Sequence, residues 1–364
     1  MRTPFYIKLA AILICIVLGT IVLIYGKEFL LPVIIAGLFS FLLYPFCKKL
    51  ELLKVPKILA VTISMLMVIV LFVLLAILIS TQLSHLVSEL NGLNAKMSIK
   101  LSATQNYLHT HLNVSNATLN QWIENGKANL LSYSGEFLSG TFAATTNFMS
   151  DLTLVAVYVF CFLLYRKSFK DFAFSLMGED KHSGVTSLFH TIQKLAQNYL
   201  IGLFTVIMII GTLNTIGLWI VGIDYAIFFG FLAALLTIIP YIGIFIGSLL
   251  PIAFALLTKD SAWSAVGVIA VFSIVQFAES NFITPKIVGS RVSINPFAAI
   301  VALLIGGQLW GAAGMILSIP LTAILKVIFD TQPSTKALGY FLGSELTDDK
   351  DDPSETFANN QKSD

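Results

Sequence analysis

The chain has 364 residues, of which 57% are hydrophobic and 12% charged, with a mean hydropathy of +0.86 and a formal net charge of +2. A soluble domain carries roughly 25% charged residues, so this composition excludes an ordinary water-exposed surface. It predicts an all-α polytopic membrane protein, and the near-neutral charge gives no indication of a nucleic-acid partner.

Apolar runs long enough to cross about 30 Å of hydrocarbon as helices recur along the chain. The first follows Arg2 and Lys8 and lacks a small-x-small cleavage site, so we interpret it as an uncleaved span rather than a signal peptide. The expected crossing helices are 6–25, 28–47, 58–80, 150–167, 199–221 and 262–282.

Two further apolar segments, 226–257 and 296–328, are too long for one crossing, since each would be about 50 Å as a straight helix. The first is interrupted at Ile239-Pro240-Tyr241-Ile242-Gly243, and the second at Gly306-Gly307-Gln308-Leu309-Trp310-Gly311. Each is either a re-entrant helical hairpin or one kinked, tilted span, and we favour hairpins. The total is about eight membrane segments, two of them broken.

Lysine and arginine set the expected orientation. The loops 47–57 and 166–194 are rich in these residues, whereas 81–149 carries three lysines and no arginine. The positive-inside rule then places both termini in the cytoplasm and 81–149 outside, as a lobe of amphipathic helices lying against the membrane or a neighbouring subunit. The predicted parts are N-terminal spans, outer lobe, C-terminal transport region and polar cytoplasmic tail: 1–80, 81–149, 150–330 and 331–364.

Signatures of soluble enzymes are missing. The sequence contains no G-x-x-x-x-G-K-[ST] phosphate loop, no H-E-x-x-H and no G-x-S-x-G. His109 and His111 are two residues apart, so on a helix they face different directions, and no acidic or cysteine partner is near in sequence. We therefore expect a protein that is not an enzyme, with no catalytic residue, no cofactor and no metal site.

The end of the run 262–282 carries the pattern Gln276-x-x-Glu279-x-Asn281. On a helix, Gln276 and Glu279 share one face. An ionised carboxyl at the centre of a bilayer costs about 2.5–3.5 kcal/mol, and withdrawal from water favours the protonated form, as a proton- or sodium-coupled carrier requires. The alternative is that Glu279 lies at the interface and reaches water.

Proline and glycine interrupt the chain after this pattern, at Pro285, Gly289 and Pro296, with Lys286 among them. Because each proline disfavours helix at the preceding residue, we expect non-helical backbone that lines protein or water, or else an ordinary interfacial loop. The interruptions of the two long segments form a second candidate feature, which either supplies hinges and backbone ligands near a transport site or simply packs helices. The residues are Pro240, Gly243, Gly247 and Pro251 in one segment, and Gly306, Gly307, Gln308 and Gly311 in the other.

Within 199–221, Asn214 is expected to hydrogen-bond a neighbouring helix, in preference to contacting substrate.

Several of these motifs together resemble the autoinducer-2 exporter family, also called PerM-type permeases. The motifs are Gln197-Asn198-Tyr199-Leu200-x-Gly202, Pro240-Tyr241-Ile242-Gly243 with Gly247 and Pro251, the series Glu279, Pro285, Gly289 and Pro296, and GGQLWGAAGMILSIPLTAIL at 306–325. Two positions depart from the family pattern: Asn295 stands where members often have histidine, and Leu203 where they often have glutamine. The resemblance implies a bacterial inner-membrane protein linked to export of autoinducer-2 or to sodium(lithium)/proton antiport.

The resulting prediction is a secondary transporter for a small polar solute, driven by a proton or sodium gradient, with sodium(lithium)/proton antiport, a membrane scaffold and a channel as alternatives. Glu279 would handle the coupling ion, and Gln276 and Asn281 would contact solute or ion, with Lys286 and Gln308 as further binding residues. The expected partners are the solute or cation, the lipid bilayer and other copies of the chain.

Overall fold

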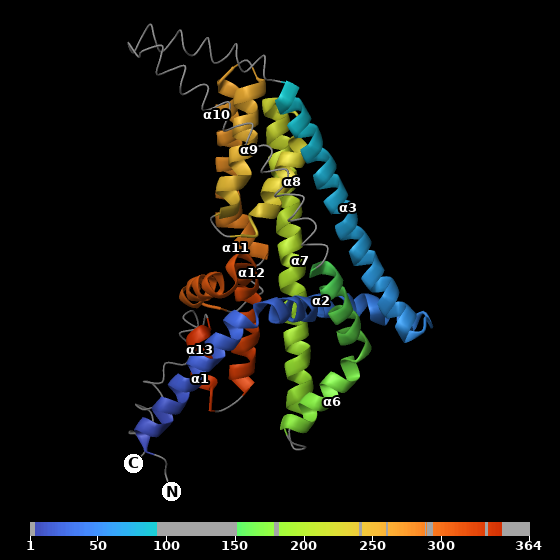
Figure 1. Cartoon of the computed structure of the whole chain (residues 1–364), viewed down its shortest axis with the longest axis vertical. Helices are drawn as coiled ribbons and strands as arrows, with labels where there is room; N and C mark the ends of the chain where they lie inside the picture. The colour runs from blue at the N-terminus through green and yellow to red at the C-terminus, as the bar shows by residue number, and fades with distance from the viewer. Residues whose placement is uncertain are drawn as a thin grey trace, which may run out of the picture. The chain divides into compact units, whose positions relative to one another are not determined.

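The computed structural model describes residues 4–92, 151–177, 182–239, 242–259, 261–287, 289, 294–331 and 334–343. All regular elements in these ranges are helices, as Figure 1 shows. They form two compact units, each assembled from separate stretches of sequence. The first comprises Met1–Tyr44, Tyr165–Val206 and Asn281–Asp364, and the second comprises Pro45–Leu164 and Ile207–Ser280. The predicted outer lobe at 81–149 lies almost wholly outside the described residues, and the four-part division of the sequence stays a prediction.

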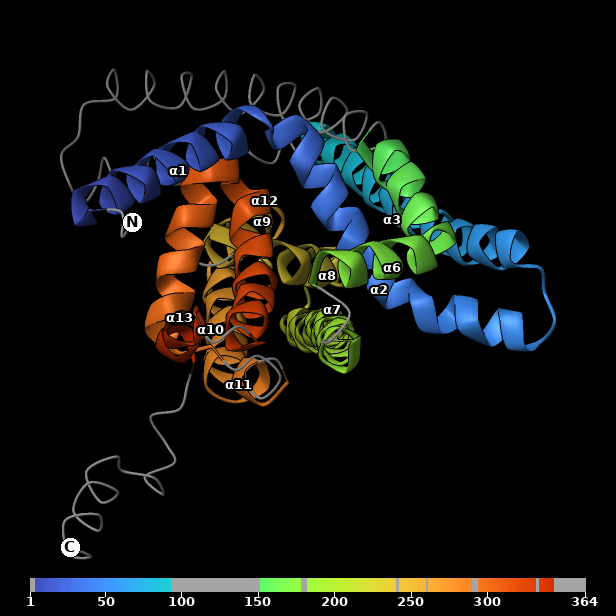
Figure 2. The ribbon, with the colours of Figure 1, turned by 90° about the horizontal axis from the view of Figure 1, so that it is seen from below.

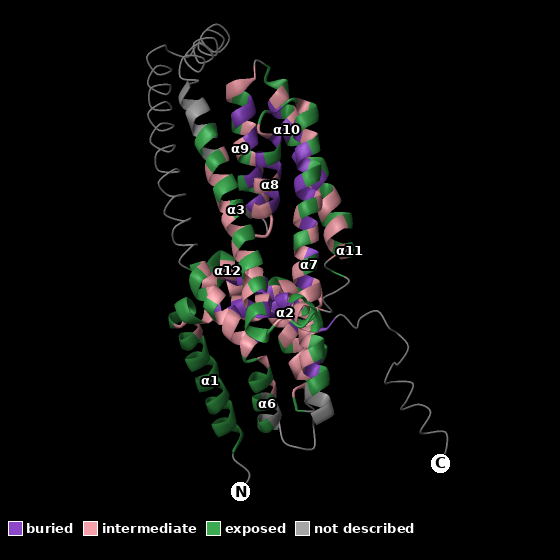
Figure 3. Ribbon diagram, turned by 90° about the vertical axis from the view of Figure 1, so that its right-hand side faces the viewer, coloured by how far each residue is buried: buried purple, intermediate pink, exposed green. Residues whose placement is uncertain are grey.

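The first unit contains α1, the first part of α2, α6, the first part of α7, α11, α12 and α13. Their bounds are Phe5–Tyr25, Lys27–Leu52, Arg166–Met177, His182–Val221, Thr284–Ile287, Pro296–Thr331 and Lys336–Leu342. Its core is apolar and joins α2, α7 and α12 through Leu38, Ala196 and Leu317. No residue of α1 is buried, and the helix is coloured as exposed along its length in Figure 3. Such a helix presents its apolar side chains to lipid or to a partner.

Helix α12 folds back on itself. Its backbone leaves helical geometry at Trp310 and Gly311, where Gly311 has φ 60° and ψ −140°, a conformation that favours glycine. A Cβ added to Gly314 would lie 1.9 Å from the carbonyl oxygen of Gly306. Residues eight apart in a straight helix are about 12 Å from each other, so the two limbs must run side by side, as Figure 2 shows. The hairpin interpretation of 296–328 is confirmed in its local geometry.

Asn295 joins the start of this hairpin to its end. Its Oδ1 accepts a hydrogen bond from the backbone N–H of Ala298 at 2.7 Å, which makes it the N-cap of α12, with Pro296 at the first helical position. Its Nδ2 donates to the carbonyl of Phe341, within the last turn of α13, at 2.6 Å, and to the carbonyl of Gly343, just beyond that helix, at 3.1 Å. Helix α13 thereby packs back along α12.

The second unit contains the last turns of α2, α3 (Lys57–Gly92), the helix Asp151–Leu164, the second part of α7, α8 (Ala226–Leu236), α9 (Ile242–Thr258) and α10 (Trp263–Ala278). Helices α8, α9 and α10 pack side by side (Figure 1) around buried Phe228, Phe229, Phe254 and Phe272. A Cβ at Gly247 would lie 2.9 Å from Cα of Ala233, and one at Gly243 would lie 1.8 Å from the carbonyl oxygen of Leu236. The segment 226–257 is therefore also a helical hairpin.

By length and composition alone, six described helices could cross a membrane, or seven with the bent pair Asp151–Leu164 and Arg166–Phe172. This count includes α12 as one element, although it folds back at Trp310 and Gly311. Five of the six predicted crossing helices match them closely or lie within them. The prediction of one continuous span at 150–167 is wrong at its end, because the chain bends by 69° at Tyr165. The apolar pattern stops at Arg166 and Lys167, and the following helix has a polar face. The chain is an all-α, multi-pass membrane protein.

Candidate functional site

The predicted polar pattern lies on one continuous helical run. Helix α10 passes at Glu279 into a π-helical turn, Glu279–Ile283, and then into α11. The backbone N–H of Glu279 donates to the carbonyls of both Val275 and Gln276, a shared bond that is common where an α-helix ends. Short π-helical turns inside α-helices are frequent at functional sites. This run also lies within the apolar span Trp263–Ile287.

Gln276 and Glu279 are both half-buried on this run. The Nε2 of Gln276 donates to Oγ of Ser280 at 2.9 Å, one turn further on. One carboxylate oxygen of Glu279, Oε2, is buried. The structure therefore brings an amide, a hydroxyl and a partly withdrawn carboxylate together at the start of the π-helical turn. Ser280 was not predicted, although its position four residues after Gln276 could have indicated it.

The other predicted binding residues are more exposed. Asn281 and Lys286 lie on the same helical run, and both are exposed. Gln308 belongs to the first limb of α12, two residues before the break at Trp310, and is also exposed. Arg291 lies outside the described residues. Only the Gln276–Glu279 pair is therefore both predicted and partly withdrawn from the surface.

The backbone expectation around Pro285 needs correction. The sequence predicted non-helical backbone from Asn281 onward, but the chain stays helical through Ile287. Pro285 is the second residue of α11 and directly follows the π-helical turn, so the helical run continues through a residue that cannot donate a backbone hydrogen bond. Gly289 follows the helix with open space around it, and Pro296 opens α12.

The predicted hinge residues of the long segments fall at the two hairpins. Gly306 packs backbone to backbone on Gly314, Gly307 packs against Met315, and Gly311 forms the break itself. In the other hairpin, Gly243 and Gly247 face α8, and Pro251 is buried inside α9. Pro240 lies outside the described residues. The predicted hinge positions thus also serve close helix packing, which was the alternative interpretation.

Asn214 in the second part of α7 is 2% exposed, and its Oδ1 has no hydrogen-bond partner among the described residues. The structure therefore gives no support, at this oxygen, for the expected hydrogen bond from Asn214 to a neighbouring helix. The adjacent Thr215 turns its hydroxyl to the carbonyl of Gly211 within the same helix, at 2.7 Å. A buried amide oxygen without a partner costs about 1–3 kcal/mol and calls for an explanation.

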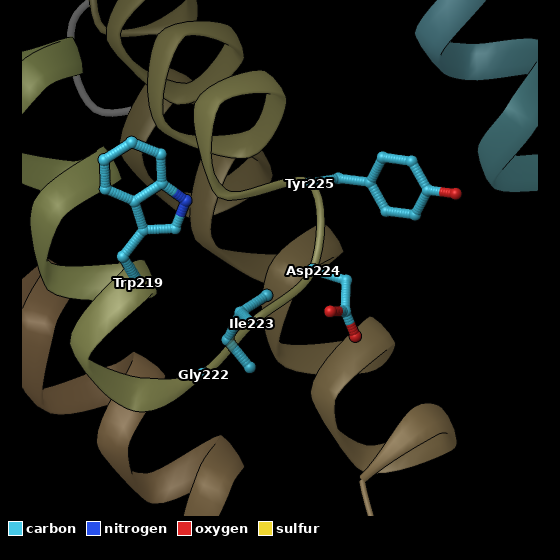
Figure 4. Close-up of a pocket in the computed structure, with 5 residues that line it drawn as sticks. All are labelled: Trp219, Gly222, Ile223, Asp224 and Tyr225. Atoms are coloured by element: carbon cyan, nitrogen blue, oxygen red, sulfur yellow. The ribbon is translucent and has the colours of Figure 1, made fainter.

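A surface hollow in the second unit lies away from these residues. It is lined by Trp219, Gly222, Ile223, Asp224 and Tyr225 at the turn from α7 to α8, shown in Figure 4. The carboxylate of Asp224 pairs there with the ammonium of Lys259 at 2.8 Å. Along α10, Glu279 is about 24 Å from Trp263, which begins the helix next to Lys259. The hollow contains none of the predicted site residues.

Comparison with known proteins decides the family. The sequence model described as "AI-2E family transporter" matches residues 12–334. The chain belongs to the AI-2E transporter family. This membership supports a transport role, with a small solute as substrate and a lipid bilayer as surroundings. It also confirms the resemblance drawn from the motifs between Gln197 and Leu325.

The relatives of this chain include several that match most of its length. "AI-2 transport protein TqsA" of Escherichia coli is 25% identical over 342 residues, covering 92% of this chain and 97% of TqsA. "Putative transport protein YueF" of Bacillus subtilis is 27% identical over 315 residues, covering 82% of each chain. A third, YrrI of Bacillus subtilis, is 39% identical over 131 residues, or 36% of each chain.

Proposed function

We propose that this protein is a secondary transporter that exports a small polar solute, using the proton or sodium gradient through Glu279. The observation that carries the proposal is the half-buried carboxyl of Glu279, placed where α10 becomes a π-helical turn inside an apolar span. Autoinducer-2 is the first solute to test, because the relative TqsA is named for its transport.

Length arithmetic supports a position of Glu279 within the hydrocarbon. The residue follows Trp263 by about 24 Å of helix and precedes Ile287 by about 12 Å, in a bilayer core of about 30 Å. Because these two lengths together exceed the core, Glu279 lies nearer its Ile287 end, where a carboxylate costs less than the roughly 2.5–3.5 kcal/mol of the bilayer centre. A carboxylate inside the hydrocarbon is nonetheless retained where it serves ions or protons. Gln276 and Ser280, which already bond each other, would offer amide and hydroxyl dipoles to the same ion or solute.

The two helical hairpins support a transporter rather than a scaffold. Paired, interrupted apolar segments in a membrane protein supply half-helix ends and hinges near a binding site. The breaks are Trp310–Gly311 in α12 and the connection between α8 and α9.

The expected location is the bacterial inner membrane with both termini in the cytoplasm. The short turn between α2 and α3 carries Lys54 and is flanked by Lys48, Lys49 and Lys57, which favours its cytoplasmic side. Reporter fusions at the α2–α3 turn and after Gly343 test this orientation, and an extracellular signal at either position would contradict it.

Reconstituted vesicles test the coupling role. Purified protein is placed in liposomes with a sodium, lithium or pH gradient, and both internal pH and uptake of labelled autoinducer-2 are followed. We expect gradient-driven flux that Glu279→Gln abolishes and Glu279→Asp retains in part, with Asp224→Asn as a matched control that keeps full flux. Cation-linked pH change without solute uptake would favour sodium(lithium)/proton antiport, and unchanged flux in Glu279→Gln would remove Glu279 from the mechanism.

A further inference from the structure

Beyond the first turn of the apolar helices α2, α9 and α12 lie four prolines, Pro32, Pro45, Pro251 and Pro320. For two of them, one in α2 and one in α12, a side chain of α7 reaches the backbone carbonyl that the proline frees. Proline has no N–H, so the carbonyl four residues earlier loses its helical hydrogen bond. In α2 the proline is Pro45 and the freed carbonyl belongs to Phe41; in α12 the proline is Pro320 and the freed carbonyl belongs to Ile316. Within a bilayer such a group needs another donor, because no water is at hand.

Side chains of α7 supply both donors. The Nε2 of Gln197 donates to the Phe41 carbonyl at 2.6 Å, and the Tyr199 hydroxyl donates to the Ile316 carbonyl at 3.2 Å. Gln197 is half-buried, and Tyr199 is 7% exposed. Two residues apart on a helix point in nearly opposite directions, so one turn of α7 reaches two different helices. All four residues belong to the first unit.

The positions of the two prolines bear on bending. Helices kink at proline because one hydrogen bond is missing and the ring crowds the preceding turn. Along α2, Pro45 is the residue at which the helix leaves the first unit and enters the second. Along α12, Pro320 lies in the second limb of the hairpin, buried against the rest of the unit. A side chain that holds a freed carbonyl fixes the bend, and its release makes the helix easier to deform.

We propose that Gln197 and Tyr199 are positioning residues of the transport cycle, each acting as a latch on a proline hinge. In the present conformation both latches are closed and tie the carbonyls of Phe41 in α2 and Ile316 in α12 to α7. Breaking either hydrogen bond leaves the backbone carbonyl without a donor, so the bond breaks only in a conformation that offers that carbonyl another donor. The proposal assumes that the protein cycles between conformations as a transporter does, but it does not depend on Glu279 or on any particular solute.

Restoring the missing backbone donor tests the pairing. Gln197→Leu and Tyr199→Phe remove the donors, while Pro45→Ala and Pro320→Ala return an N–H to the freed carbonyls. We expect Gln197→Leu to lower the midpoint of thermal unfolding by several degrees in the natural background and to have little effect in the Pro45→Ala background. The pair Tyr199→Phe and Pro320→Ala should behave in the same way. Equal losses in both backgrounds would overturn the pairing.

Hydrogen exchange tests the hinge without any substrate. Peptides covering 38–48 and 313–323 should exchange several-fold faster in the matching latch variant and several-fold slower in the matching proline-to-alanine variant. The mild Tyr199→Phe change keeps the ring and its packing, so the α12 arm stays informative if Gln197→Leu fails to fold. Exchange that is unaffected by loss of the latch would overturn the hinge.

Measurements of transport rate distinguish a hinge that moves during transport from a hydrogen bond that only stabilises the fold. The double variant Pro45→Ala/Gln197→Leu is expected to unfold at the natural temperature yet to transport at least tenfold more slowly, because its helix no longer bends. Natural flux in this stable double variant would overturn the role in the cycle. Absence of flux in the unmodified protein for sodium, lithium and autoinducer-2 would count against the proposed function, while the unfolding and exchange results would still decide the latch.

Discussion

The contact between Gly306 and Gly314 gives a sharp test of the α12 hairpin. Gly314→Ala would place a Cβ 1.9 Å from the carbonyl oxygen of Gly306, whereas ordinary contact begins at 3.4 Å, so the limbs must separate by about 1.5 Å. Overpacking of this kind costs about 1–3 kcal/mol, and a backbone obstacle favours the upper end. The gain of about 1 kcal/mol for alanine over glycine in a helix offsets only part of it.

The net expectation for Gly314→Ala is a loss of about 1–2 kcal/mol, or roughly 1–3 °C in the unfolding midpoint measured by intrinsic fluorescence in detergent. Gly37→Ala in α2 is the matched control, because nothing lies within 4 Å of its added Cβ and the change should be neutral or stabilising. If both variants unfold at the same temperature, the limbs are not in contact, and α12 would be a single bent span.

Three further variants test individual contacts. Asn295→Ala should lose the N-cap and two donated bonds, about 2–3 kcal/mol, whereas Asn295→Asp keeps the cap acceptor and should lose less; equal unfolding midpoints would contradict the double role. Trp310→Phe removes the bond from Nε1 to the Leu23 carbonyl, 2.8 Å long, and should cost about 1 kcal/mol, with Trp263→Phe as a control at an exposed indole. Asn214→Leu removes a buried, unpartnered oxygen and should raise the unfolding midpoint; a lower midpoint would show that the amide is bonded in the membrane.

Local patterns predicted much of this fold. Continuous apolar runs located the crossing helices, and the lengths of 226–257 and 296–328 indicated hairpins before any contact was known. The boundaries of α7 were predicted less well, because its first turns from His182 are too polar to register as membrane-spanning. The interleaving of the two units along the sequence depends on contacts between distant residues, which periodicity does not encode.

In the candidate site, too, local spacing was predicted from the sequence and the finer backbone geometry was not. Helical spacing correctly placed Gln276 and Glu279 on one face of a helix. The π-helical turn was not predicted, because it shifts the hydrogen-bond register by one residue and no residue type in the sequence indicates such a shift. A usable signal was nonetheless present for the contacts of α7: each proline within an apolar helix implies a carbonyl, four residues earlier, that needs a donor. The long-range bonds of Lys57 to Leu164 and of Trp310 to Leu23 obey a related rule, since both end on carbonyls in the last turn of a helix.

The interleaved construction has a consequence for synthesis of the chain. The Phe41 carbonyl and its donor Gln197 are 156 residues apart, and Leu23 is 287 residues from Trp310. At about 5–20 residues per second, these carbonyls enter the membrane about 8–30 s and about 15–60 s before their partners are made. During that interval α1 and α2 must find temporary donors in headgroups, water or the insertion machinery. The first unit therefore stays chemically incomplete until almost the entire protein has left the ribosome.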